Sequence, residues 1–93
     1  MSSKLEKLFN LMQSLEAKAD LKRVTKTWED LPDGIRKALD KAMNIGIPRE
    51  KAVYRVSNVD GVTLCLAEYK DEKNNFTASY LVYGSDVLYV NES

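Results

Sequence analysis

The stretch Val62-Thr63-Leu64-Cys65-Leu66-Ala67-Glu68-Tyr69 decides the fold of this chain. It is rich in apolar and β-branched residues, which are typical of a β-strand. The Asp60-Gly61 pair just before it is a strong short-range signal for a tight hairpin. We therefore predict that this stretch is the central strand of an antiparallel meander that covers about residues 52–90.

The rest of the meander follows from alternation and from the turn residues between the strands. Six polar residues, 70–75, predict a longer solvated hairpin loop, and Gly84-Ser85-Asp86 predicts another turn. The four expected strands cover about residues 52–57, 62–69, 76–83 and 87–90.

Upstream of the sheet, the apolar period changes to that of helices. Ser3-x-x-Glu6 is a capping box, and it predicts a helix over about residues 3–20. The apolar stripe of this helix contains Leu5, Leu8, Phe9, Met12, Leu15 and Ala19. A second helix, about residues 31–44, is predicted to begin after the capping residue Asp30 and to end before Gly46 and Pro48. The expected fold is a single α+β domain over residues 1–93, with two N-terminal helices packed on a four-stranded antiparallel meander (ααββββ).

Composition and charge exclude several classes of protein. The 93 residues are 44% hydrophobic and 30% charged with a formal net charge of zero, which argues against global disorder. No apolar run is long enough to cross a membrane, and the start of the chain lacks a signal-peptide pattern, so a cytoplasmic location is expected. Cys65 is the single cysteine and histidine is absent, which excludes an intrachain disulfide and a Cys/His pair.

The sequence also lacks the patterns that carry catalysis. It has no His/Cys metal spacing, no phosphate-binding loop and no nucleophile elbow. Its carboxylates fall at predicted caps, helix surfaces and turns, where each has a structural explanation. We therefore expect no enzymatic activity, no cofactor and no metal.

Alternation along the strands assigns two faces to the sheet. The bulky face, expected to be the core beneath the helices, contains Tyr54, Val56, Val62, Leu64, Leu66, Phe76, Ala78, Tyr80 and Val82. The other face contains Val53, Arg55, Ser57, Thr63, Cys65, Ala67, Tyr69, Thr77, Ser79, Leu81 and Tyr83. This second face is poor in charge for a solvated sheet face, so we weigh three covers for it: the first helix of the same chain, a second molecule, or water alone.

The charge-poor second face suggests a small protein-binding or regulatory module, expected to be homodimeric. Its predicted partner-binding residues are Val53, Arg55, Tyr69, Leu81 and Tyr83. Such a module would act by occupying a surface of a larger protein, as do many small inhibitory accessory proteins of mobile genetic elements. A related alternative is that the first helix detaches and docks into the groove of a partner.

Nucleic-acid binding is the alternative function. The first 28 residues contain six basic and three acidic residues, for a net charge of +3. The segment that would contact nucleic acid contains Lys18, Lys22, Arg23, Lys26 and Trp28. A basic patch this small predicts weak, salt-sensitive binding.

Overall fold

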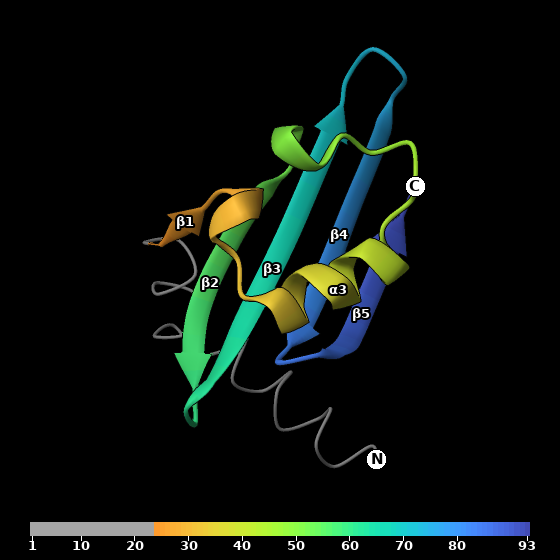
Figure 1. Ribbon diagram of the computed structural model, residues 1–93. Helices are drawn as coiled ribbons and strands as arrows, with labels where there is room; N and C mark the ends of the chain where they lie inside the picture. The colour runs from red at the N-terminus through yellow and green to blue at the C-terminus, as the bar shows by residue number, and fades with distance from the viewer. Residues whose placement is uncertain (1–23) are drawn as a thin grey trace.

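The computed structural model describes residues 24–93, which form a five-stranded antiparallel sheet covered on one side by helix. The strands lie in the order of the chain, β1-β2-β3-β4-β5 (Figure 1). Their bounds are β1, Thr25–Lys26; β2, Val53–Val59; β3, Val62–Asp71; β4, Phe76–Tyr83; and β5, Asp86–Glu92. The α-helix is α3, Asp33–Ala42, and two 3-10 helices are η1, Trp28–Asp30, and η2, Arg49–Lys51.

The predicted arrangement of two helices on four strands is wrong. Between residues 24 and 93 the chain has one α-helix and five strands, so it is mostly sheet with a small helical part. The additional strand is β1, in which Thr25 pairs with Arg55 and Lys26 with Tyr54. The predicted helix over residues 3–20 lies outside the described residues.

Strand β1 forms because the chain before α3 passes along the open edge of β2. The backbone N–H of Val56 donates to the carbonyl oxygen of Val24 at 3.0 Å. Valine and threonine favour extended backbone and are weak helix formers. This short strand therefore pairs with backbone groups at the edge of β2, which a four-stranded meander would leave unpaired.

Helix α3 is shorter than the predicted 31–44 segment, for reasons visible at both ends. Pro32 is extended, with φ −57° and ψ 149°, so the helix begins one residue later at Asp33. Met43 is also extended, and its N–H donates to the carbonyl oxygen of Leu39. The apolar residues at the two ends, Leu31 and Met43, are nevertheless buried and pack with the helix against the sheet.

The tight hairpin predicted at Asp60-Gly61 is confirmed. Asp60 and Gly61 have positive φ values of 53° and 79°, and the flanking residues Val59 and Val62 pair directly. Two central residues of positive φ match the twist of the strands they join. This turn also determines which residues of β3 share a face with which residues of β2.

The predicted faces of β3 are wrong by one residue. Because the turn has two residues, even-numbered positions of β2 pair with odd-numbered positions of β3: Tyr54 with Ala67, and Val56 with Cys65. Directly paired residues point to the same side of a sheet. The side chains of Cys65 and Ala67 therefore lie under α3, and those of Leu64 and Leu66 lie on the opposite face.

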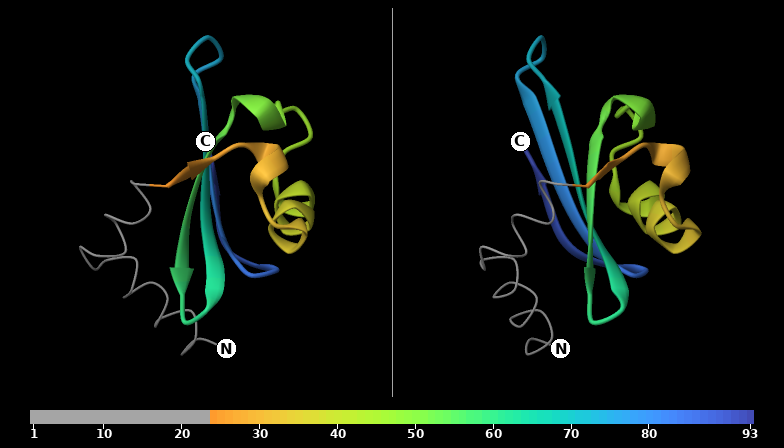
Figure 2. Two further views of the ribbon diagram at one scale, coloured as in Figure 1. Left: turned by 60° about the vertical axis from the view of Figure 1, so that its left-hand side comes forward. Right: turned by 90° about the vertical axis from the view of Figure 1, so that its left-hand side faces the viewer.

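The main core lies between α3 and the sheet. Ile35 and Leu39 of the helix are at most 1% exposed, and they pack with the buried residues Tyr54, Tyr80 and Val82 of the strands. Figure 2 shows α3, η1 and η2 on the same side of the sheet. No helix in the described part of the chain is long and apolar enough to span a membrane.

Candidate protein-binding face

The sheet face turned away from α3, called here the far face, is the candidate site. Register places on it the residues that pair across the strands on that side, such as Arg55 with Leu66, and Leu66 with Leu81. In the described strands its main members are Val53, Arg55, Ser57, Val59, Val62, Leu64, Leu66, Glu68, Thr77, Ser79, Leu81, Tyr83 and Tyr89.

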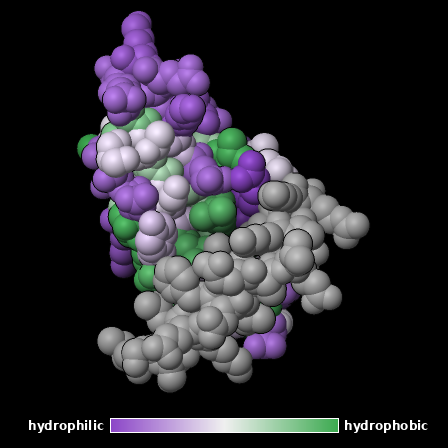
Figure 3. Space-filling view, turned by 180° about the vertical axis from the view of Figure 1, so that it is seen from behind, coloured by the Kyte–Doolittle hydropathy of each residue, from purple (hydrophilic) through white to green (hydrophobic). Residues whose placement is uncertain are grey.

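The far face has an apolar centre of its own. Leu64 is 0% exposed and Leu81 is 3% exposed, and four half-buried side chains pack against them: Val59, Leu66, Tyr83 and Leu88. We call these six residues the far-face cluster. It is separate from the core under α3. In the view from behind, hydrophilic surface occupies the end that carries the β3–β4 hairpin, and apolar patches lie among polar ones nearer the middle (Figure 3).

Few charged residues lie around this cluster, and two of them form an ion pair. Arg55 and Glu68 lie on neighbouring strands and form an ion pair, in which the guanidinium donates to the carboxylate. Lys70 and Asp86 lie at opposite ends of the face, beyond the cluster. A face with a paired charge and an apolar centre resembles the core of a protein–protein interface, where unpaired charges are depleted.

The structure brings four of the five predicted partner-binding residues onto this face: Val53, Arg55, Leu81 and Tyr83. Val53 is 40% exposed, and the hydroxyl of Tyr83 donates to the carbonyl oxygen of Val59 at 3.0 Å. Tyr69 is not with them. It pairs with Ala78 on the α3 side, and its ring lies 6.3 Å from that of Phe76.

Sequence reasoning missed Leu64 and Leu66 as members of the site, because it placed them in the core beneath the helices. A signal in the sequence could have found them. A two-residue turn pairs residues of opposite parity, so the Asp60-Gly61 hairpin alone implies that Leu64 and Tyr54 lie on opposite faces. The corrected face is more apolar than the predicted one.

Strand β5 is the edge of the described sheet, and it carries exposed apolar side chains. Val87, Tyr89 and Val90 are each 40–47% exposed. Leu81 pairs with Tyr89 and Val82 with Val87, so Leu88 is an extra residue that forms a β-bulge. Bulges twist edge strands and disrupt regular pairing with another strand. This bulge disfavours strand addition at β5.

The predicted nucleic-acid segment is only partly described. Lys18, Lys22 and Arg23 lie outside the described residues, and Lys26 is exposed in β1. Trp28 packs into the protein: its ring is 5.6 Å from the ring of Tyr54, and the guanidinium of Arg49 lies 5.8 Å from its centroid. A tryptophan held between two side chains is a poor platform for stacking a base.

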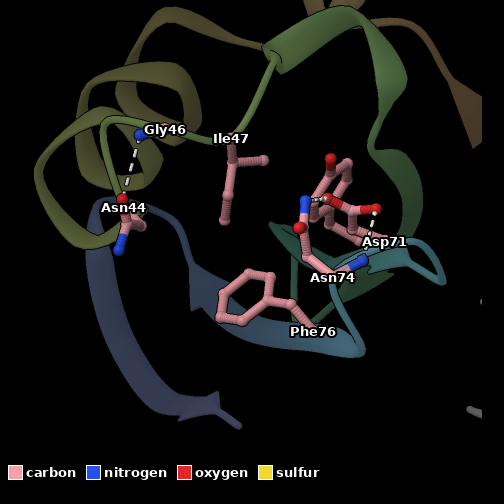
Figure 4. A pocket seen from close by; sticks show the side chains of 7 residues that line it. Asn44, Gly46, Ile47, Asp71, Asn74 and Phe76 are labelled. Carbon is pink, nitrogen blue, oxygen red and sulfur yellow. Dashed lines mark hydrogen bonds between the residues drawn. The ribbon is translucent and has the colours of Figure 1, made fainter.

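A small cleft on the α3 side is a second place where a ligand could fit. It has a volume of about 350 Å³ and lies between the loop after α3 and the β3–β4 hairpin. Its lining residues are Asn44, Gly46, Ile47, Tyr69, Asp71, Asn74 and Phe76 (Figure 4).

The polar groups of this cleft are already engaged with one another. Gly46 N donates to Asn44 Oδ1 at 2.9 Å, and Asn74 Nδ2 donates to Asp71 Oδ2 at 2.7 Å. The hydrogen bond from the Asn74 side chain is the main cause that lowers the pKa of Asp71. An ionised, internally bonded carboxylate is unsuited to act as a general base at neutral pH.

The groups with raised pKa values lie in the core under α3. Burial raises the pKa of the Cys65 thiol to about 12, and burial is also the largest cause that raises the pKa values of Tyr54 and Tyr80 to about 12. Such values keep all three groups neutral at physiological pH. Within residues 24–93 there is also no group of three or more His, Cys, Asp or Glu side chains that could hold a metal ion.

Comparisons of the chain with protein-family models, with curated proteins and with solved structures find no match. The assignment of a function therefore depends on the far face itself.

Proposed function

We propose that this chain is a small, non-enzymatic protein-binding module that acts through the far face of its sheet. The observation that carries the proposal is the far-face cluster, an apolar centre bordered by the Arg55–Glu68 ion pair. Association through such a face removes the exposed parts of its half-buried side chains from water, and the Arg55–Glu68 pair leaves neither of its charges unpaired. The partner is a second copy of the chain, a larger protein whose surface the module occludes, or both in turn.

The chemistry of the described residues supports a binding role over a catalytic one. Asp71, in the cleft on the α3 side, has a lowered pKa, and Cys65, Tyr54 and Tyr80 have raised pKa values of about 12. None of these shifts moves a group toward the near-neutral value that general acid–base catalysis favours. The packing of Trp28 against Tyr54 leaves the nucleic-acid alternative without a favourable observation, and that alternative stays a prediction.

The test uses two valines that are equally exposed and lie on opposite faces of the sheet. Val53 and Val87 are both 40% exposed strand residues, but Val53 pairs with Glu68 on the far face, and Val87 pairs with Val82 on the α3 side. Val53→Lys places a charge on the proposed interface, and Val87→Lys is the control. We expect Val53→Lys to weaken self-association at least ten-fold in sedimentation equilibrium, with Val87→Lys near wild type.

Binding to a larger protein is tested with the same pair of variants as affinity baits in the native host. A partner of the far face is retained by the wild type and by Val87→Lys and is lost with Val53→Lys. Circular dichroism spectra establish that both variants keep the fold. Equal behaviour of the two variants, in self-association and in retention of a partner, would contradict the proposal.

A further inference from the structure

We infer that the far-face cluster is the docking site of this chain's own N-terminal segment, residues 3–20, whose apolar stripe is its resting occupant. The inference goes beyond the proposed function, because it names what covers the binding face in the free protein. It depends on three separate observations, which concern burial, sequence pattern and reach.

The burial of Leu64 and Leu81 is the first observation. They are 0% and 3% exposed, although the strand register places both on the sheet face opposite that of Tyr54 and Tyr80. The helices α3, η1 and η2 lie on the other side of the sheet (Figure 2). Neighbours on one sheet face leave part of a leucine open to water unless a second layer covers it. Within residues 24–93, no helix or strand forms such a layer. The burial of these two leucines is therefore the first argument for a second layer on the far face.

The sequence of residues 3–20 has the pattern that such a layer needs. It begins with the Ser3-x-x-Glu6 capping box, and its apolar side chains recur at helical spacing on one stripe. A helix of this length spans about 27 Å, and the ten residues of β3 span about 33 Å. The amphipathic stripe that the sequence predicts and the apolar far face of the sheet are therefore complementary surfaces of similar length.

The connection between the segment and the sheet is long enough for this docking. Val24 is fixed at the sheet edge by its hydrogen bond from Val56 N, and β1 follows directly. Neighbouring strands are about 4.8 Å apart, so β3 lies about 10 Å across the sheet from β1. A layer that packs on a sheet lies about 10 Å above it, so residue 20 would be about 14 Å from Val24. The four Cα steps between them can span about 14 Å when extended. Residue 20 can therefore lie over the strand that carries Leu64.

This occupant links docking to the proposed function. If residues 3–20 rest on the far face, then a second copy or a larger partner gains the far-face cluster only when the segment moves away. The segment then acts as an intramolecular competitor, and weakening its stripe should strengthen association. This last step rests on the proposed function, whereas the docking itself does not.

The docking is tested in the full chain by methyl NMR. We expect nuclear Overhauser contacts between the methyl group of Met12 and the methyl groups of Leu64 and Leu81. A sample that mixes labelled and unlabelled chains shows whether the contacts are within one molecule. Contacts within one molecule support the inference. Contacts only between molecules, or no contacts at all, would overturn it.

A matched pair of variants tests the stripe itself. Met12 lies on the apolar stripe, and Ser14 lies on the opposite side of the same predicted helix. We expect Met12→Asp to change the methyl shifts of Leu64 and Leu81 and to raise binding of an apolar dye several-fold, and Ser14→Asp to do neither. Trp28 emission reports on the α3-side core in both variants. If that emission shows that Met12→Asp unfolds the sheet, the contacts in the unmodified chain decide the question alone.

The same variants separate the docking from the proposed function. If the docking and the proposed function are both correct, Met12→Asp self-associates at least ten-fold more tightly than the wild type. Adding Val53→Lys to Met12→Asp then reverses this increase in affinity. Docking contacts without association, even in Met12→Asp, would uphold the docking and count against the proposed function. Equal effects of Met12→Asp and Ser14→Asp on the far face, with the fold intact, would refute the docking.

Discussion

Alkaline pH should destabilise this protein through Cys65, which the structure buries under α3. Burial raises the pKa of this thiol from an ordinary value of 9.0 to about 12 in the folded state. Between these two values the folded chain keeps a proton that the unfolded chain loses, so stability falls as pH rises. The contribution is fully present below pH 9, decreases through this window, and is lost above pH 12.

The loss in the free energy of unfolding depends on how much of the pH interval between the two pKa values of Cys65 is crossed. Each pH unit between the two pKa values costs about 1.4 kcal/mol. Raising the pH from 8 to 10.5 crosses about 1.5 units of the window that begins at 9.0, so Cys65 alone should lower the free energy of unfolding by about 2 kcal/mol. The raised pKa values of Tyr54 and Tyr80 act in the same direction above pH 10.

The assay is urea unfolding at both pH values, followed by far-ultraviolet circular dichroism. The control is Cys65→Ala, which removes the thiol and keeps both tyrosines, so that most of their contribution cancels in the comparison. We expect the wild type to lose about 2 kcal/mol more than Cys65→Ala between pH 8 and pH 10.5. Equal losses in the two proteins would refute the placement of Cys65 in a dry core and, with it, the corrected face of β3.

Two further predictions test the helix–sheet core and the hairpin that determines the register. Leu39→Ala removes a side chain of α3 that is 0% exposed and should cost roughly 2–5 kcal/mol in urea unfolding. Lys37→Ala on the exposed side of the same helix should stay within about 0.5 kcal/mol of wild type, and similar costs for both would contradict the packing of α3. Gly61→Ala forces a β-carbon into a backbone with φ of 79° and should cost about 1–2 kcal/mol, because that conformation is unfavourable for L-residues. Stability of Gly61→Ala equal to wild type would argue against the positive-φ turn.

Local signals in the sequence were sufficient for much of the fold. Asp60-Gly61 predicted the tight hairpin. The polar run 70–75 predicted the longer turn between β3 and β4, although Lys70 and Asp71 extend β3 and leave residues 72–75 as the turn. Pro32 and the apolar spacing from Ile35 to Leu39 predicted the helix that became α3. These features depend on residues close together in the chain, whose conformational preferences act whatever the rest of the protein does.

The face of β3 was not assigned correctly, because apolar residues occupy both of its sides. Val62, Leu64 and Leu66 are larger than Thr63, Cys65 and Ala67, so size alone placed them in the core. In the structure the small residues lie under α3, where Cys65 and Ala67 are both 0% exposed and leave room for the helix. For this reason Tyr69 was grouped wrongly with the far-face residues Val53, Arg55, Leu81 and Tyr83.

The sequence by itself thus determined the strands of the meander, their hairpins and the position of the described helix. Only the tertiary structure decided that β1 pairs with the edge of β2, that Trp28 packs on Tyr54, and that Leu64 and Leu81 form a second apolar centre. The physical reason is that each of these contacts joins residues far apart in the chain. Their formation depends on which surfaces remain open after the local elements have formed, and no local pattern records that.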